Sequence, residues 1–374
     1  MSHHDVRPAL DAVVAVAAEH AASVDREGRF PSESLAAMKR EGLLGLVSAE
    51  SHGGMGHGLR DAATVVEALG RACGSTAMVV CMHYAGTLVI ERFGDDATRR
   101  EIARGEHLST LAFSEAASRS MFWAPASTAT RVDGGVRLDA RKSWVTSANA
   151  AHSYVWSSKP VEGGEASTIW LVPRDAKGLT VDRPFTGLGL RGNESSPVTA
   201  DNVVVPESAR LGDDGKGFAV MMEVVLPAFS AMNSACSVGI MEAAVARSAE
   251  HASGARWSHS GQNPADLATV RAYLAKAKVK TDMARALWLD TLDALTTGRA
   301  DAMLRVLECK AACNDAAIEV TDLAMRVCGG AAFRGDVGVE RYFRDARAGA
   351  VMAPTSDALY DFIGKAICNM PLFG

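Results

Sequence analysis

The segment Arg141-Lys-Ser-Trp144-Val-Thr146-Ser147-Ala148 lies at the centre of the most β-like part of this sequence, residues 111–172. It continues the strand pattern of its neighbours, and an aromatic side chain near the strand end is followed closely by two hydroxyls. Trp144 could cover a flat ligand ring while Thr146 and Ser147 hydrogen-bond to the polar edge of that ring. Alternatively, this is an ordinary strand whose tryptophan packs in a core.

The surrounding sequence predicts more strands. Short apolar or alternating runs separated by turn residues indicate strands over residues 128–132, 136–139, 143–146, 154–157 and 168–172. The first two are joined by Asp-Gly-Gly, which supplies the positive φ that a tight hairpin turn needs. We therefore expect a β domain in the middle of the chain.

The sequence on both sides of this β region is predominantly helical. Apolar residues at three-and-four spacing predict helices over residues 9–24, 32–41, 61–70, 75–93, 218–252, 264–296, 299–327 and 357–367. Pro227 lies inside the fifth of these, so we expect a kink or break there. The sequence thus predicts an α+β fold with an N-terminal helical domain (1–110), a middle β domain (111–212) and a C-terminal helical bundle (213–374).

Composition narrows the class of protein. The chain has 374 residues, of which 48% are hydrophobic and 22% charged, with a net charge of −5. These values are typical of a globular protein and argue against nucleic acid or an anionic membrane as the main partner. We see neither a bilayer-spanning apolar run nor a signal peptide. Seven scattered cysteines favour a reducing, cytoplasmic compartment, and Cys309 and Cys313, without further ligands nearby, predict packing rather than a metal site.

Five stretches, in order along nearly the whole chain, resemble motifs of the acyl-CoA dehydrogenase superfamily of flavoproteins. They are Leu111-Ala-Phe113-Ser114-Glu115; Lys142-Ser-Trp-Val-Thr-Ser147; Gly187-Leu-Gly-Leu-Arg191-Gly with Val203-Val-Val-Pro206; Val327-Cys-Gly329-Gly330; and Arg344-Asp-Ala-Arg347 through Ala353-Pro-Thr355. Each is weak alone, but their order within a helix–sheet–helix frame makes the resemblance strong. It implies a middle β-barrel, a C-terminal four-helix bundle, noncovalently bound FAD and a homotetramer or homodimer in which one subunit's bundle completes its neighbour's FAD site.

The resemblance assigns part of the FAD site to the β domain. Phe113 and Ser114 would face the reactive edge of the flavin. Trp144, Thr146 and Ser147 would hold the flavin ring.

Other FAD contacts implied by the resemblance lie near the C-terminus. Gly329, Gly330 and Thr355 would approach the pyrophosphate and ribose, because glycine lets the backbone come close to phosphate. Arg256 and Arg326 are further candidates. Alternatively, the two glycines only end a helix, and Arg326 only satisfies carbonyls at that helix end.

The chain departs from the superfamily at the catalytic base. The dehydrogenases use a glutamate to remove the substrate α-proton, a role that suits a carboxylate whose pKa is raised by burial. One usual position of that glutamate is occupied here by Ala353-Pro-Thr355, and the other falls on Phe229 or Ser230. Asp357 could be a relocated base, although a carboxylate at a helix start is also explained by the helix dipole.

The remaining candidate residues are tied to these departures. Ser230 and Asn233 are candidates for polar groups near the flavin, and Phe229 for contact with the substrate. Ser120, in a segment that replaces the family's Gly-Ser-Asp, is a second candidate for substrate contact. Each could instead be an ordinary packed or surface residue.

Three functions remain open from the sequence. The first is an FAD-dependent oxidoreductase that uses oxygen, as a monooxygenase or oxidase, and acts on a CoA or carrier-protein thioester or a related small molecule; it could need a separate flavin reductase. The second is an α,β-dehydrogenase with Asp357 as base, passing electrons to an electron-transfer flavoprotein. The third is a non-catalytic subunit that binds flavin or a partner enzyme.

Overall fold

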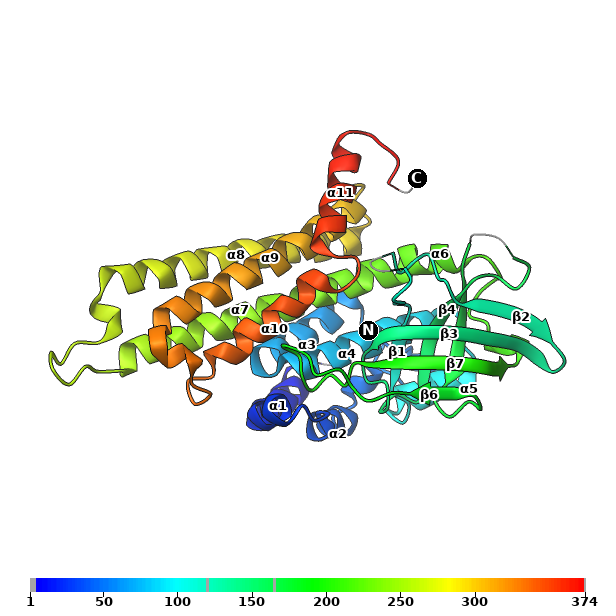
Figure 1. Cartoon of the computed structure of the whole chain (residues 1–374), viewed down its shortest axis with the longest axis horizontal. Coiled ribbons are helices and arrows are strands. Elements are labelled where there is room, and N and C mark those ends of the chain that lie inside the picture. The colour runs from blue at the N-terminus through cyan, green and yellow to red at the C-terminus, as the bar shows by residue number, and fades with distance from the viewer. Residues whose placement is uncertain (1–4, 119–120, 164–165, 373–374) are drawn as a thin grey trace.

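The structure, a computed structural model, describes residues 5–118, 121–163 and 166–372. Helices come first, then strands, then helices, which confirms the expected α+β fold (Figure 1). In Figure 1 the strands gather at one end of the molecule, and long C-terminal helices extend from them to the other end.

The N-terminal region is helical, as expected. Its elements are α1 (Arg7–Glu27), α2 (Ser32–Arg40), the short 3-10 turns η1 (Leu43–Gly45) and η2 (Glu50–His52), α3 (Leu59–Ala72), α4 (Gly74–Phe93) and α5 (Asp96–Ala103). The sequence did not predict α5, which is mostly polar and begins where the Asp95 carboxylate accepts hydrogen bonds from the Ala97 and Thr98 amides. By contrast, α4 is buried on nearly every side, as expected for a central helix.

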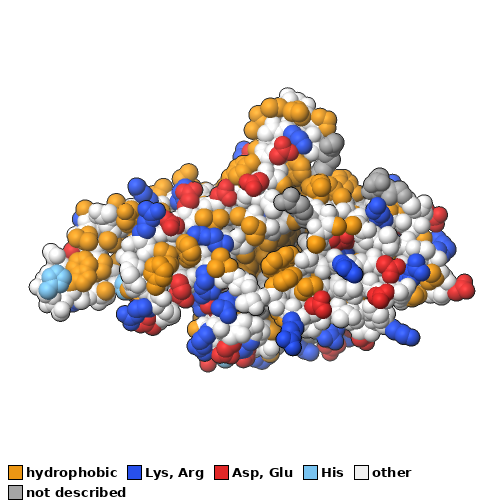
Figure 2. Space-filling model, in the orientation of Figure 1, with side chains coloured by type: hydrophobic (Ala, Val, Ile, Leu, Met, Phe, Trp, Pro, Cys, Tyr) orange, Lys and Arg blue, Asp and Glu red, His pale blue; other side chains and the backbone are white. Residues whose placement is uncertain are grey.

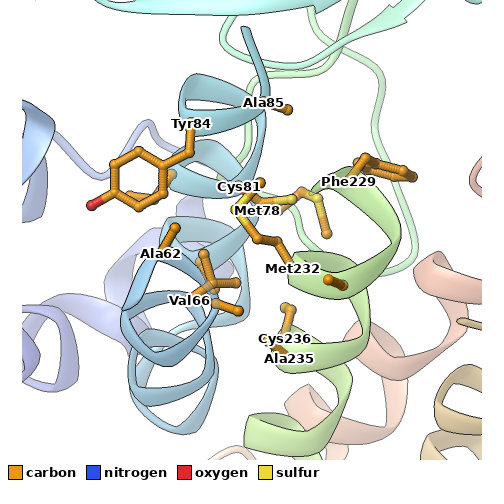
Figure 3. Close-up of a cluster of buried hydrophobic side chains, with 14 of the residues drawn as sticks. Ala62, Val66, Met78, Cys81, Tyr84, Ala85, Phe229, Met232, Ala235 and Cys236 are labelled. Carbon is orange, nitrogen blue, oxygen red and sulfur yellow. The ribbon is translucent and has the colours of Figure 1, made fainter. Parts of the chain in front are cut away.

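The two helical regions share one hydrophobic core, in which α3 and α4 pack against α7 (Figure 3). Two glycines allow α3 and α7 to approach closely. A Cβ added at Gly70 would lie 2.8 Å from the carbonyl oxygen of Cys236, and one added at Gly239 would lie 2.2 Å from that of Glu67. Any larger side chain at either position would push the helices apart, so this core couples the two ends of the sequence.

The strands form two sheets that pack around a core of their own. The three-stranded sheet has the order β1-β4-β5, and the four-stranded sheet has the order β2-β3-β7-β6. Their bounds are β1 (Ser109–Ala112), β2 (Thr128–Val132), β3 (Gly135–Val145), β4 (Ser153–Ser158), β5 (Thr168–Pro173), β6 (Leu179–Val181) and β7 (Ser196–Val205). The expected hairpin is confirmed as the antiparallel pair β2–β3. Between the sheets, Trp156 and Trp170 pair in register and are fully buried.

The C-terminal region begins with one long rod that changes its winding. The 3-10 turn η3 (Glu207–Ala209) leads to α6 (Gly217–Val220), then to a π-helical turn, η4 (Met221–Val225), and to α7 (Leu226–Gly254). The interruption expected near Pro227 is therefore confirmed. Because proline removes an amide donor and crowds the preceding turn, the wider π turn accommodates it.

The remaining helices complete the bundle. They are η5 (Pro264–Asp266), α8 (Ala268–Thr297), α9 (Ala302–Cys328), η6 (Gly329–Phe333), α10 (Val339–Val351) and α11 (Ser356–Ile367), the last of which projects from the body (Figure 1). The sequence did not predict α10. By length and composition the segment Gly217–Gly254 could cross a membrane, contrary to our expectation, but 94% of its most apolar window is buried inside the protein.

Candidate active site

A cavity of about 540 Å³ lies where the β domain, the start of α7 and the end of α10 meet. Hydrophobic side chains gather around a hollow near the centre of the face in Figure 2, below the projecting α11. The lining residues are Met82, Leu111, Phe113, Ser114, Glu115, Ala116, Phe122, Ser143, Trp144, Phe185, Gly187, Gly189, Leu190, Arg191, Asn193, Ser195, Val225, Leu226, Phe229, Ala348, Val351, Met352, Ala353, Pro354 and Thr355. A cavity of this size and mixed character suits a cofactor or small molecule.

An aromatic pair forms one wall. Trp144 adopts a positive φ of 57° at the end of β3, and its ring stacks on Phe185 with centroids 4.2 Å apart. Such a backbone conformation is unfavourable for a bulky residue, and strain of this kind clusters at ligand sites. Although it is hydrophobic, Trp144 is 59% exposed, which leaves one ring face available to a ligand.

Two hydroxyls expected to contact a flavin lie behind this wall. Thr146 and Ser147 are buried and are not among the residues that line the cavity, although Thr146 lies 3.4 Å (Oγ1 to Oγ) from the cavity residue Ser195. The Ser147 hydroxyl has no hydrogen-bond partner within the described part of the chain, and its φ is 56°. A buried hydroxyl without a described partner, close to an aromatic pair whose Trp144 ring is exposed, fits a flat cofactor ring with polar edges.

A buried ion pair supports the wall from within the β domain. Lys142 Nζ lies 2.5 Å from Glu115 Oε1 and also donates to the carbonyl and hydroxyl of Ser157. Glu115 in turn accepts from the amides of Ala126 and Ser127. Burial lowers the pKa of Lys142 to about 8 against the effect of Glu115. Burial alone would raise the pKa of Glu115, but the Lys142 charge and the hydrogen bonds from Lys142, Ser127 and Ala126 together lower it. The Glu115 carboxylate at the cavity is therefore already paired with Lys142 and hydrogen-bonded to the Ala126 and Ser127 amides.

The other end of the cavity is apolar. Phe113 and Phe122 lie parallel with ring centroids 6.5 Å apart, and Met82, Leu226 and Phe229 add to the same apolar surface. The structure therefore brings Phe113, Phe229 and the polar Ser114 to a single cavity. Such a surface suits an apolar group of a ligand.

Asp357, the candidate for a relocated base, is exposed in the first turn of α11 and does not line the cavity. Thr355 lines the cavity and caps the same helix by accepting from the Ala358 amide at 3.4 Å. Asp357 thus occupies a position that the helix dipole favours.

Ser230 and Asn233 are buried in α7, behind the cavity residues. The Ser230 hydroxyl has no partner among the described residues. Asn233 accepts a hydrogen bond from Asn314 at 2.9 Å and lies 3.6 Å (Nδ2 to Sδ) from Met352, which lines the cavity. Asn233 therefore reaches the site through Met352, while Ser120 lies outside the described residues.

Four candidates for FAD contact lie at the other end of the bundle. Arg256 follows α7 at its end, about 40 Å along the helix from Phe229 at 1.5 Å per residue. Arg326, Gly329 and Gly330 lie at the exposed end of α9, where Arg326 pairs with Asp322 and Gly329 has a φ of 55°. None of the four lines the cavity of its own subunit.

Sequence reasoning assigned no role to the loop of residues 187–191, although it quoted the loop as a motif. Asp345 of α10 accepts a hydrogen bond from the Leu190 amide at 2.6 Å, and Leu190 has a φ of 49°. Burial raises the pKa of Asp345 to about 6. Phe185 was also missed. The signal for it was an aromatic residue just before a glycine-rich loop.

Comparisons with known proteins cover most of the chain. Family models for the N-terminal, middle and C-terminal domains of acyl-CoA dehydrogenase match residues 2–105, 110–203 and 215–368. The chain is 28% identical over 355 residues to a probable acyl-CoA dehydrogenase of Bacillus subtilis, covering 91% of this chain and 90% of that protein. It is 27% identical over 357 residues to cyclohex-1-ene-1-carbonyl-CoA dehydrogenase of Geobacter metallireducens, with 94% and 93% covered.

Solved structures share the fold. Butyryl-CoA dehydrogenase of Megasphaera elsdenii superposes with a TM-score of 0.90 at 20% identity, covering 98% of this chain and 99% of that one. A prolyl acyl carrier protein oxidase superposes with a TM-score of 0.88 at 20% identity, covering 98% and 100%.

Proposed function

The chain belongs to the acyl-CoA dehydrogenase family, and we propose that it is an oxygen-using oxidoreductase of acyl thioesters. Its cofactor is FAD, as in the family. When bound, FAD supplies exchange of electron pairs and, once reduced, reactivity toward oxygen. The chain itself must position the ring, exclude or admit water and oxygen, and hold any proton.

We place the flavin ring against Trp144 and Phe185. The stacked pair leaves an aromatic face open to the cavity, and the unpartnered Ser147 hydroxyl lies just beyond the strand end. Ser114 lies in the same wall, because its carbonyl accepts from the Ser143 amide at 2.9 Å. An aromatic face with small polar groups at its margin matches a ring whose centre is apolar and whose edge is polar.

One observation favours oxygen chemistry over α-proton abstraction. Among the described residues that line the cavity, Glu115 is the single carboxylate. Its oxygens already accept hydrogen bonds from Lys142 and from two backbone amides. Its pKa is lowered, whereas a base for an α-proton needs a pKa raised toward that of the acid it deprotonates. Reaction of reduced flavin with oxygen does not need such a base.

The substrate is an acyl thioester with an apolar acyl group in this proposal. The Phe113–Phe122 end of the cavity presents no charged side chain among its described lining residues, so an ionised acyl group would lose its hydration there without a partner. Relatives named for CoA thioesters, and a neighbour named as a carrier-protein oxidase, make either carrier reasonable.

Six of the cysteines are buried and free, in keeping with a reducing, cytoplasmic setting.

The main alternative is a dehydrogenase that uses Asp357 and passes electrons to an electron-transfer flavoprotein. One structural neighbour is described as an electron-transferring flavoprotein system, which keeps this route open. Against it, Asp357 is exposed and outside the described cavity lining. A non-catalytic flavin-binding subunit is the third reading.

The test follows the visible absorption of the FAD-loaded protein under anaerobic conditions while a panel of acyl-CoAs is added, and then on admitting air. We expect no bleaching until an external reductant is supplied, followed by oxygen-dependent modification of the thioester. Bleaching by the thioester followed by rapid reoxidation with release of hydrogen peroxide would instead require a base that removes the α-proton. The first outcome identifies a monooxygenase and the second an oxidase.

Bleaching by the thioester alone with slow reoxidation in air would overturn the proposal. If that bleaching is lost in Asp357→Asn but kept in Asp361→Asn, one turn further along α11, the relocated base is correct. Asp361 is the matched control because it is an exposed carboxylate of the same helix, paired with Lys365. A protein that cannot be loaded with FAD would refute both readings, and the flavin-binding subunit with them.

A further inference from the structure

Lys310 lies in the first half of α9 and is fully buried. A buried lysine usually pairs with a carboxylate, because an isolated ammonium loses its hydration. Lys310 instead donates to three backbone carbonyls, those of Gly349 at 3.3 Å, Met352 at 3.0 Å and Pro354 at 2.8 Å. An ammonium has three N–H donors, so three carbonyls use its full capacity.

All three acceptors belong to one stretch of the cavity wall. Residues 348–355 contain the end of α10 and the turn into α11, and Met352, Ala353 and Pro354 line the cavity. Because α10 ends at Val351, carbonyls in its last turn lack the amide partners that a continuing helix would provide. Lys310 supplies such a partner to Gly349, and it also binds the carbonyls of Met352 and Pro354 just beyond the helix.

A second group from α9 reinforces the same stretch. Asn314, one turn beyond Lys310, accepts from the Ser237 hydroxyl at 2.7 Å and donates to Asn233, which approaches Met352. A Cβ added at Gly349 would lie 2.0 Å from the Asn314 side-chain oxygen, so α9 and α10 meet with no space between them. Lys310 and Asn314 therefore act on the wall from one helix face.

We propose that Lys310 is a positioning residue of the active site, whose ammonium fixes residues 349–354 against the space that the reacting part of the substrate occupies. The inference rests on the proposed function only in taking this cavity as the reaction site. Lys310 touches neither the cavity nor a ligand directly. Its effect passes through the wall, so its loss should loosen that wall while leaving the rest of the bundle in place.

The surroundings of Lys310 make its charge sensitive to pH. The titratable groups that face it are Cys81 of α4 and Asp315 of α9, while α7 contributes the Phe229 ring, 5.8 Å from Nζ. Burial lowers the pKa of Lys310 to about 7. Burial also raises the pKa of Cys81, so that thiol stays neutral. Above its pKa, Lys310 has two N–H donors for three carbonyls.

The test compares amide hydrogen exchange by mass spectrometry in the FAD-loaded wild type and in Lys310→Met. We expect amides of residues 349–356 to exchange at least about tenfold faster in the variant, with exchange in α8 changed less than about twofold. The control is Lys278→Met, in which an exposed lysine of α8 that pairs with Asp282 is removed. Unchanged exchange at 349–356, or a uniform increase along the chain, would overturn the proposal.

A second measurement needs no variant. In the wild type, exchange at residues 349–356, corrected for the intrinsic pH dependence, should rise relative to the rest of the chain between about pH 6 and about pH 9. A constant ratio would contradict a role for the ammonium. Neither measurement involves substrate or oxygen, so failure of the proposed reaction and failure of this positioning role are separately visible.

Discussion

The buried pair Glu115–Lys142 gives the sharpest prediction, since each partner alone would be an isolated charge inside the β domain. Both side chains are almost inaccessible to solvent, at 4% and 0% exposure. Removing one partner of such a pair typically destabilises a protein by about 3–5 kcal/mol, because the other charge stays buried without compensation. We expect Lys142→Met and Glu115→Gln each to lose stability in this range.

The structure also predicts which single change is worse. Without Lys142, the Glu115 carboxylate still accepts from the amides of Ala126 and Ser127 and from the Ser127 hydroxyl, and it can take up a proton. Without Glu115, the ammonium keeps only neutral oxygens, chiefly those of Ser157. Glu115→Gln should therefore be the more damaging change. The double variant should recover most of the loss, since no charge remains buried.

The assay is urea unfolding followed by tryptophan fluorescence, at fixed protein and FAD concentrations because bound ligand shifts apparent stability. Lys177→Met, at an exposed position of the same domain, is the control and should change stability by less than about 0.5 kcal/mol. If either single variant loses under about 1 kcal/mol, or if the two losses simply add in the double variant, the pair is not coupled as described.

Three further predictions concern the cavity walls. Asp345→Asn keeps an acceptor for the Leu190 amide but removes a buried carboxyl whose pKa is raised to about 6. Because the folded state favours the protonated carboxyl, the wild type loses stability as pH rises through 6, and the stability from urea unfolding should favour the variant increasingly from about pH 4 to about pH 7, by up to about 3 kcal/mol. A difference that does not change with pH would contradict this. Trp144→Ala should raise the dissociation constant of FAD about tenfold in ultrafiltration assays, and unchanged retention would remove Trp144 from the cofactor site. Gly349→Ala should lower the free energy of unfolding, measured with urea, by about 1–3 kcal/mol because the added Cβ would clash with Asn314. Adding Asn314→Ala in the same chain should partly restore the stability. An unaltered midpoint for Gly349→Ala would show that the helices are not in contact there.

Local periodicity was sufficient to predict most of the fold. The β2–β3 hairpin follows from alternation around Asp-Gly-Gly, and the break before α7 follows from Pro227. Elements whose pattern is weak were missed. Helix α10 carries many charged residues, so its helical pattern is weak. Its stabilising contacts are with residues distant in sequence, such as the ion pair between Arg344 and Asp25 of α1 at 2.5 Å.

The candidate site divides in the same way. Phe113, Trp144 and Thr355 line the cavity, and each sits in a short motif that local sequence makes visible. Lys310 looks like any lysine of a long helix, because its acceptors lie 39 to 44 residues further along the chain. Local patterns cannot show such contacts. Ser230 and Asn233 share a face of α7, but local reasoning could not tell whether that face meets the cavity or another helix.

The shared core of α3, α4 and α7 has a consequence for how the protein forms during synthesis. Helices α3 and α4 are complete at Phe93, but α7, which packs against them, ends only at Gly254. At ribosomal speeds of 5–20 residues per second, the intervening stretch of about 160 residues takes roughly 10–30 s to emerge. For that interval the nascent chain displays the apolar faces of α3 and α4 to the cell. The division into three consecutive domains therefore describes the sequence, whereas folding of the first domain must wait for the third.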